Sequence, residues 1–347
     1  MMRLPAFRYR APRTVGEAAA WLAESPVDTM LLAGGTDLLP NMKRRQQTPR
    51  TLIGLRGIEA LRLIAVEPDA AGDDASLRIG AGVTLGALVG DERIRAAAPG
   101  LWQAASQVAT PHLRNMGTLG GNLCLDTRCT YYDQSYEWRK AIDFCLKKDG
   151  GTCWVATSSP RCLAVSSSDT APMLQALDAR VRLVSAAGAR EVSLAALYRN
   201  DGLDYLTRRP DEILVEVTLP DLSRTRSAYW KLRRRGAFDF PVASVAAAAR
   251  FDPDGRVESA CLVVGAAASC PLGVPAAESL LVGDRLTDER IAAAAAAAYQ
   301  VAKPMDNTDF ELVWRKRMVT TLATCALREL RGDDMRPERL RLARQLL

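Results

Sequence analysis

The segment Ala33-Gly34-Gly35-Thr36-Asp37-Leu38 follows a short apolar run and precedes a sequence of helical character. Two adjacent glycines let the backbone approach a ligand closely, and consecutive N–H groups in such a turn can hold a phosphate. A helix that begins directly after the turn adds its positive end to the same place. A second glycine cluster, Gly117-Thr118-Leu119-Gly120-Gly121-Asn122, has the same properties. Neither turn is specific alone, but the two together suit a dinucleotide with one pyrophosphate and an adenosine tail.

Outward from these turns, short helices and strands alternate, and this pattern predicts an α+β fold. Thr14 followed by Glu17 has the form of a capping box and marks the start of a helix. Apolar or alternating segments predict strands at 29–32, 52–55, 61–66, 77–81, 181–185, 212–219, 229–232, 244–251 and 257–265. Helices are expected within 14–22, 38–45, 84–89, 94–108, 166–177, 292–298 and 310–329.

The chain is too long for one small domain, because single cores stop growing near about 250–300 residues and this chain has 347. We expect three regions, at residues 1–57, 58–222 and 223–347. Within the second region, the segment from about residue 125 to residue 163 differs in composition from the rest of the chain and has no clear helix or strand period. This segment contains six of the twenty aromatic residues of the chain. It is therefore interpreted as an insertion.

Composition and charge exclude several classes of protein. The chain is 48% hydrophobic and 25% charged, as in an ordinary globular protein. It has no apolar run long enough for a membrane span and no recognisable secretory signal, so we expect a cytoplasmic location without a membrane partner. The net charge of +6 is mild, and the basic clusters at 43–45, 233–235 and 331–344 are short. Nucleic-acid binding is not expected.

The cysteines are unevenly distributed, since five of the eight lie between Cys124 and Cys162. Clustered cysteines in a cytoplasmic chain more often bind metal or act in redox chemistry than form disulfides. Four of them are separated by 15, 7 and 8 intervening residues, and this set is Cys129, Cys145, Cys153 and Cys162. Their spacing leaves an iron–sulfur cluster, zinc and inert buried thiols open. His112 is the only histidine, which excludes sites that need several histidine ligands.

Three motifs in order carry a family resemblance: the turn at 33–38, the segment Arg114–Asn122, and Ser168-Asp169-Thr170-Ala171-Pro172. Together they resemble the FAD-binding (medium) subunit of the xanthine-oxidase-type molybdenum hydroxylases, over nearly the whole chain. The resemblance implies a FAD-binding fold of the vanillyl-alcohol-oxidase/CO-dehydrogenase flavoprotein type, with a cysteine-rich insertion and a C-terminal α+β domain. Regions 1–57 and 58–222 would be its two FAD-binding subdomains.

The segment that begins at Cys124 and continues through Tyr131-Tyr132-Asp133-Gln134-Ser135 is similar to the β subunits of the 4-hydroxybenzoyl-CoA reductase branch of this family. In that branch the insertion carries a [4Fe–4S] cluster on four cysteines. The resemblance implies that Cys129, Cys145, Cys153 and Cys162 are the ligands, and it leaves Cys124 outside the set.

The family motifs also imply roles in holding FAD. Backbone N–H groups would wrap the pyrophosphate at Leu31, Leu32, Ala33, Gly34, Gly35, Thr36, Asp37 and Leu38. The other side of the cofactor would be held by Thr118, Gly120, Gly121 and Asn122. Asp169 would bind a polar part of FAD, Lys231 would lie near the isoalloxazine, and Val108 and Leu214 would line the pocket. Val108 departs from the aromatic residue of some relatives, which places a stacking role there in doubt.

The function implied is electron transfer, and the chain is expected to contain no catalytic residue of its own. In the branch resembled, a phenolic hydroxyl of 4-hydroxybenzoyl-CoA is removed reductively at molybdenum in a molybdopterin-containing large subunit. Electrons would pass from a low-potential donor such as ferredoxin to the cluster and then to FAD. They would continue to two [2Fe–2S] clusters in a small subunit and to molybdenum, within a heterohexamer.

Three alternatives remain open at this point. The same subunit could serve a related hydroxylase that acts on another aromatic or N-heterocyclic substrate. A zinc-stabilised module without redox function would bind one zinc ion and lack colour. A self-sufficient flavin oxidase would need a general base near the flavin, and His112 is the histidine available for that role.

Overall fold

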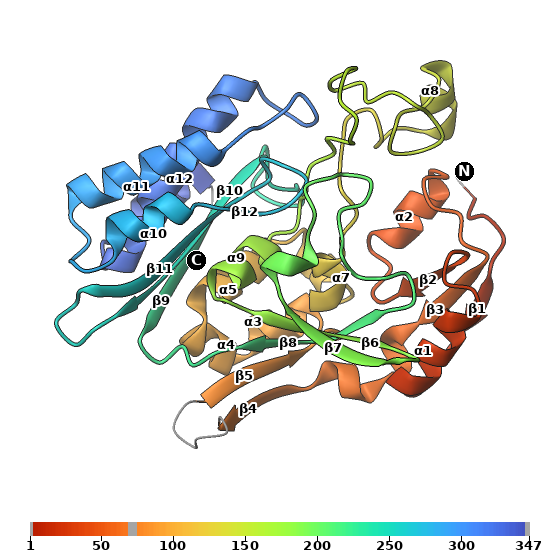
Figure 1. Ribbon diagram of the computed structural model, residues 1–347, viewed down its shortest axis with the longest axis horizontal. Coiled ribbons are helices and arrows are strands. Elements are labelled where there is room, and N and C mark those ends of the chain that lie inside the picture. Colours follow the sequence, from red (N-terminus) through yellow and green to blue (C-terminus); the bar gives the residue numbers. More distant parts are fainter. Residues whose placement is uncertain (1–2, 69–74, 344–347) are drawn as a thin grey trace.

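The computed structural model describes residues 3–68 and 75–343, so the ends of the first and third expected regions (1, 2 and 344–347) lie outside it. The described strands form three sheets that follow one another along the chain (Figure 1). Helices separate the sheets and cover the last one. The basic segment 331–344 ends at residue 344, which lies outside the described residues.

The first sheet is parallel, with the strand order β1 (Arg8–Arg10), β3 (Thr51–Gly54), β2 (Thr29–Leu32). Helix α1 (Val15–Glu24) connects β1 to β2, and its start agrees with the predicted cap, because Thr14 Oγ1 accepts the Glu17 N–H at 3.1 Å. Its buried face, Ala18, Ala19 and Leu22, packs against the sheet. Helix α2 (Leu38–Lys43) follows β2 after the glycine turn.

The second sheet is antiparallel, in the order β4 (Ile64–Pro68), β5 (Ala75–Gly80), β8 (Ile213–Leu219), β6 (Arg180–Ser185), β7 (Gly188–Ser193). Short helices pack on it and share its hydrophobic core. They are α3 (Leu85–Gly90), α4 (Glu92–Ala97), α5 (Pro99–Ser106), α7 (Leu119–Leu123) and α9 (Thr170–Ala176). Helix α6 (Pro111–Arg114) lies between α5 and α7 along the chain, and 3-10 turns occupy Leu55–Gly57, Glu59–Arg62 and Ala195–Leu197.

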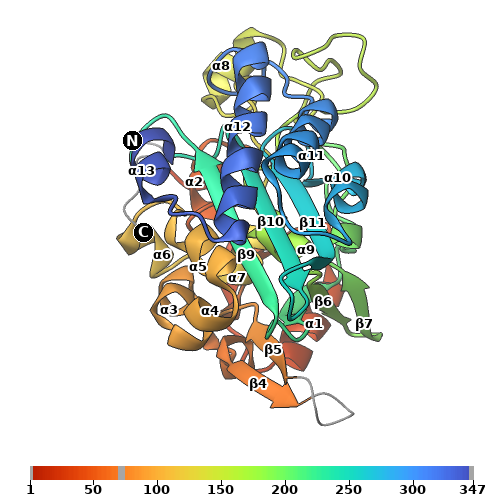
Figure 2. The ribbon, with the colours of Figure 1, turned by 90° about the vertical axis from the view of Figure 1, so that its left-hand side faces the viewer.

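The third sheet is also antiparallel and has the order β12 (Leu272–Gly273), β11 (Val257–Gly265), β10 (Ala243–Phe251), β9 (Thr225–Leu232). Helices α10 (Pro275–Leu281), α11 (Asp288–Val301) and α12 (Leu312–Arg331) cover one face (Figure 2). The opposite face packs on the second region, where Tyr229, Ala246 and Val263 join its core. The small side chains of β10 allow this packing on both faces. The described chain ends with α13 (Arg336–Glu338) and a π-helical turn at Arg339–Ala343.

The structure corrects several sequence-based expectations. The helix expected at 94–108 is two helices, because Pro99 has no backbone N–H and its ring clashes with the preceding turn, so α4 ends at Ala97 and a second helix begins at the proline. The strand expected at 61–66 begins only at Ile64, after a 3-10 turn. The glycine cluster is itself largely helical, as α7, and β1 and β7 were not expected from the sequence.

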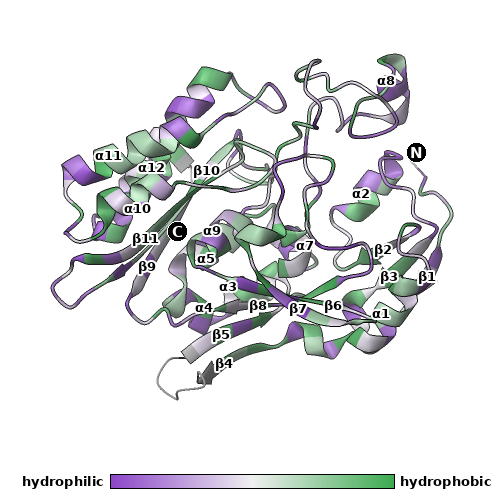
Figure 3. Ribbon diagram, viewed as in Figure 1, coloured by the Kyte–Doolittle hydropathy of each residue, from purple (hydrophilic) through white to green (hydrophobic). Residues whose placement is uncertain are grey.

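The cysteine-rich insertion (residues 125–163) extends away from the sheets in both views (Figures 1 and 2). Its one helix is α8 (Tyr136–Ala141), and the rest is turns and irregular chain. Figure 3 shows hydrophobic and polar residues interspersed along it. Its base is closed where Arg128 and Val165 exchange backbone hydrogen bonds of 2.8 and 2.7 Å. None of the described helices is both long and apolar enough to cross a membrane.

Candidate functional site: a dinucleotide cavity beside a four-cysteine cavity

A cavity of about 900 Å³ lies between the two glycine turns. All of the expected FAD-binding residues except Leu32 and Lys231 line it. The lining set is Leu31, Ala33, Gly34, Gly35, Thr36, Asp37, Leu38, Val108, Thr118, Gly120, Gly121, Asn122, Asp169 and Leu214. Leu32 instead packs beside the small core of α2 and β3. The structure therefore brings the three sequence motifs together around one space.

The two glycine turns are in direct contact. Gly35 has a φ of +72°, a left-handed conformation that favours glycine. A Cβ atom on Gly34 would lie only 1.9 Å from the carbonyl oxygen of Met116, in the segment that enters the second turn. The first turn therefore needs a glycine at position 34 for its fit against the second turn.

The second turn is fixed by its own side chains. Thr118 caps α7, since its Oγ1 accepts the N–H of Gly121 at 3.1 Å. The Asn122 side-chain oxygen accepts three hydrogen bonds from the third motif: from Ser168 Oγ at 2.8 Å, and from the Thr170 N–H and hydroxyl at 3.2 and 2.7 Å. Asn122 thus joins the second and third motifs, and its oxygen is already occupied by protein donors.

Asp169 lies in the cavity wall, and Lys231 lies behind it. Lys231 Nζ is 2.9 Å from Asp169 Oδ2 and donates to the Gln107 carbonyl at 3.0 Å, while the Tyr229 hydroxyl donates to Asp169 Oδ1 at 2.8 Å. Burial raises the pKa of Asp169 and lowers that of Lys231, and the ion pair between them opposes both shifts. Lys231 is wholly buried, so its expected position near the isoalloxazine is one layer back from the cavity surface.

The base of the insertion forms part of the same wall. Arg128 forms an ion pair with Asp37 of the first turn, and its guanidinium also lies 3.1 Å from Asp133 and from the Asn41 side-chain oxygen. Its guanidinium stacks 5.0 Å from the ring centre of Phe240. Arg128 thus connects the first glycine turn with the insertion and with the loop after β9.

Sequence reasoning missed much of the remaining wall, because these residues belong to no motif. Phe238 and Phe240 are exposed residues that line the cavity from the third region. Phe238 has a φ of +76°, held by a hydrogen bond of 3.1 Å from its N–H to the Ala109 carbonyl. Charged side chains of both signs also line the cavity: the cations are Arg44, Arg56, Arg62, Arg128 and Arg208, and the anions are Asp37, Asp126, Asp169, Asp204 and Asp239. His112 lies on the exposed surface of α6 and is not among the lining residues.

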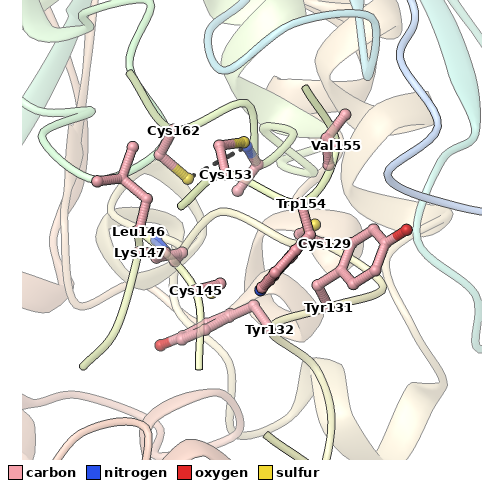
Figure 4. A pocket seen from close by; sticks show the side chains of 11 residues that line it. Cys129, Tyr131, Tyr132, Cys145, Leu146, Lys147, Cys153, Trp154, Val155 and Cys162 are labelled. Atoms are coloured by element: carbon pink, nitrogen blue, oxygen red, sulfur yellow. Dashed lines mark hydrogen bonds between the residues drawn. The ribbon is translucent and has the colours of Figure 1, made fainter. Parts of the chain in front are cut away.

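The four expected cysteine ligands meet in the insertion. Cys129, Cys145, Cys153 and Cys162 are all buried and line one small cavity together with Tyr131, Tyr132, Lys147 and Trp154 (Figure 4). Burial raises the pKa of Cys129 to about 12 and that of Cys162 to about 11. Without a metal these two thiols therefore stay protonated at neutral pH. Cys124 is separate from this set and lines the large cavity.

The thiols of this cavity can be compared with the needs of two kinds of metal centre. No group of three or more His, Cys, Asp or Glu side chains among residues 3–68 and 75–343 is placed to hold a single metal ion. A zinc ion needs four sulfurs at about 2.3 Å from one point. A polynuclear cluster holds its thiolates farther apart, and it needs sulfur donors in an apolar pocket. Four buried thiols that line one cavity supply the sulfur donors that a cluster needs.

Comparisons with known proteins agree with this geometry. Residues 5–222 match the family described as the FAD binding domain in molybdopterin dehydrogenase, and residues 227–330 match the CO dehydrogenase flavoprotein C-terminal domain. The chain is 32% identical to the aldehyde oxidoreductase FAD-binding subunit PaoB of Escherichia coli (strain K12), over 92% of this chain and 98% of that protein. It is 28% identical to the nicotinate dehydrogenase FAD-subunit of Eubacterium barkeri, over 90% and 92%. Among solved structures, carbon monoxide dehydrogenase from Hydrogenophaga pseudoflava matches with a TM-score of 0.76 and 27% identity, over 95% of this chain and 98% of that chain.

Proposed function

Because this chain belongs to the family of FAD-binding subunits of molybdopterin dehydrogenases, we propose that it relays electrons between a donor and a molybdenum-containing partner through FAD and a [4Fe–4S] cluster. The observation that carries the first half is the 900 Å³ cavity, around which all three sequence motifs meet. The observation that carries the second half is the small cavity lined by four buried cysteines.

The residues of this chain have separable roles toward FAD. The contact between Gly34 and Met116 sets the spacing of the two glycine turns, whose backbone N–H groups would bind the pyrophosphate. Asn122 and Asp169 hold the wall opposite the first turn, each through hydrogen bonds to neighbouring segments. Cationic side chains such as Arg208 lower the cost of placing phosphates in the cavity. When bound, FAD supplies one- and two-electron chemistry that no side chain of this chain provides.

For the cluster, we propose the ligands Cys129, Cys145, Cys153 and Cys162, which would supply four thiolates in an apolar pocket. A cluster in this place supplies one-electron transfer near the surface of the insertion. Trp154 lines the cysteine cavity and is itself partly exposed, so the proposed cluster would lie one side chain from solvent at this point. This position suits electron entry from a separate low-potential protein such as ferredoxin.

The proposed partners are a molybdopterin-containing large subunit and a small subunit with two [2Fe–2S] clusters. The proposed reaction is the reductive dehydroxylation of 4-hydroxybenzoyl-CoA, supported by the likeness of the insertion to the subunits of that branch. A second candidate is an enzyme that acts on an aldehyde or on an N-heterocycle. The 32% identity to an aldehyde oxidoreductase subunit, over nearly its full length, favours the aldehyde.

The deciding experiment is the measurement of iron, acid-labile sulfide and zinc in the isolated subunit, purified without oxygen. The isolated subunit is needed because the small partner would add iron of its own. The cluster proposal predicts about four iron and about four sulfide per chain and no stoichiometric zinc. About one zinc without iron would support the zinc module instead. FAD without either metal would leave a flavin subunit with an inert cysteine cavity.

Variants make the assignment specific. Cys145→Ser should lose iron and sulfide but keep FAD, because the cysteine cavity and the large cavity are separate. Cys325→Ser is the matched control, since Cys325 is equally buried but lies in α12 of the third region. Full iron in Cys145→Ser would disprove the ligand assignment. The substrate is then decided by assaying the complete enzyme with 4-hydroxybenzoyl-CoA under reducing conditions and with aromatic aldehydes under oxidising conditions.

A further inference from the structure

A buried ion pair connects a residue that lines the large cavity with a residue that lines the cysteine cavity. Asp126 lines the large cavity, whereas Lys147 and Tyr132 line the cysteine cavity. Lys147 Nζ lies 2.8 Å from Asp126 Oδ1, and the Tyr132 hydroxyl donates to Asp126 Oδ2 at 2.9 Å. Figure 4 shows Lys147 and Tyr132 beside Cys145. The ion pair therefore has its cation at the cysteines and its anion at the dinucleotide cavity.

The lysine is held rigidly in this position. Besides Asp126, its Nζ donates to Thr127 Oγ1 at 2.7 Å and to the Gly202 carbonyl at 2.6 Å, which uses all three of its N–H groups. The side chains of both Lys147 and Asp126 are only 5% exposed. Among the described residues that line the cysteine cavity, Lys147 is the one with a formal positive charge. Its charge is thus fixed at the cavity and poorly screened by solvent.

We propose that the Lys147–Asp126 pair is a fixed dipole that sets the reduction potential of the cluster in the cysteine cavity. This inference rests on the proposed cluster. Four thiolates give the cluster a net negative charge, and its reduction by a low-potential one-electron donor adds one more electron without making or breaking a bond. The nearer positive end favours the reduced form and raises the potential, and the more distant carboxylate offsets part of this effect.

If the pair acts as a dipole, removal of its cation and removal of its anion must shift the reduction potential of the cluster in opposite directions. Lys147→Met removes the cation and leaves Asp126, so the potential should fall. Asp126→Asn removes the anion and leaves the cation uncompensated, so the potential should rise. Lys147→Arg keeps the charge and should stay close to the wild type. Lys148→Met is the matched control, because Lys148 is partly exposed, lines neither cavity and pairs with Asp149 at 3.0 Å.

The experiment is a potentiometric titration of the anaerobically purified holoenzyme, followed by electron paramagnetic resonance of the four-iron cluster, with iron, sulfide and FAD counted in each variant. Lys147→Met should change the equilibrium constant for cluster reduction by about tenfold or more, which is about 59 mV for a one-electron couple. Asp126→Asn should change the equilibrium constant for cluster reduction several-fold in the other direction. Lys148→Met should move it by less than about twofold.

The results separate the inference from the proposed function. A wild-type chain without a four-iron cluster would refute the proposed function itself. If the wild-type chain holds the cluster, the reduction potentials of Lys147→Met and Asp126→Asn decide the inference. Potentials equal to the wild-type value, or shifted in the same direction in both variants, would overturn the dipole and leave the ion pair with a structural role only. If Lys147→Met fails to assemble the cluster, Asp126→Asn decides alone: a rise supports the inference, and a fall or no shift overturns it.

Discussion

Replacement of Gly34 by alanine is the sharpest test of how the dinucleotide cavity is built. The new methyl group would lie 1.9 Å from the Met116 carbonyl oxygen, 2.5 Å from its carbonyl carbon and 2.9 Å from the Gly117 nitrogen. An ordinary carbon–oxygen contact is about 3.3 Å, so the two glycine turns must separate by more than about 1 Å. All three clashing atoms belong to the backbone, so no flexible side chain can yield.

The expected loss is in FAD affinity. Overpacking of this kind costs about 1–3 kcal/mol, and each 1.4 kcal/mol is a factor of ten in a dissociation constant, so Gly34→Ala should weaken FAD binding by about 5-fold to 150-fold. Gly16→Ala is the control, because Gly16 lies in α1 outside the cavity and its methyl group would meet no atom within 4 Å. Titration of the flavin-free protein with FAD, followed by flavin fluorescence, measures both constants. Equal affinities for Gly34→Ala and the wild type would refute the idea that the contact between the turns shapes the site.

Three further predictions concern the walls of the two cavities. Lys231→Met leaves the buried carboxylate of Asp169 without its cation and should cost about 3–5 kcal/mol in the free energy of unfolding, measured by urea denaturation of the flavin-free protein; an unchanged midpoint would contradict this. Asn122→Ala removes the acceptor of three hydrogen bonds and should cost about 1–3 kcal/mol together with lower FAD occupancy in the purified protein, and full FAD retention would speak against it. In metal-free protein, burial raises the pKa of Cys129 to about 12 and that of Cys162 to about 11. At pH 8, alkylation should therefore be slower than that of an ordinary thiol by about 1000-fold at Cys129 and about 100-fold at Cys162, and both rates should rise with pH. Rapid alkylation of both thiols at pH 8 would show that they are not buried as described.

The parts of the fold that were predictable are those with a local physical cause. The cap at Thr14 and the alternating strand β8 follow from side-chain chemistry within a few residues. The break between α4 and α5 also has a local cause, Pro99, which the hydrophobic period alone conceals. Strand β1 was not predictable in this way, because two of its three residues are exposed and the strand owes its conformation to pairing with β3.

The residues of the candidate site also differ in whether a local sequence pattern reveals them. Backbone-binding turns leave a glycine signature in the sequence, so the residues from Ala33 to Leu38, which line the cavity, could be singled out from their pattern. Arg128 carries no such signature: its importance comes from meeting Asp37 across 91 positions of the chain, and only the fold reveals that contact. Lys231 shows the reverse case, because its expected place at the flavin is separated from the cavity by Asp169.

The placement of the insertion explains how a long segment can join this fold without disturbing the dinucleotide cavity. The insertion leaves the body after α7 and returns before α9, and its two ends are hydrogen-bonded to each other at Arg128 and Val165. Because the ends are already adjacent, a long excursion between them adds little closure entropy. The same two flanking helices carry the second and third motifs, which Asn122 joins below the insertion. A segment added at this point therefore lies next to the dinucleotide cavity, and Lys147 of the added segment can reach Asp126 in its wall.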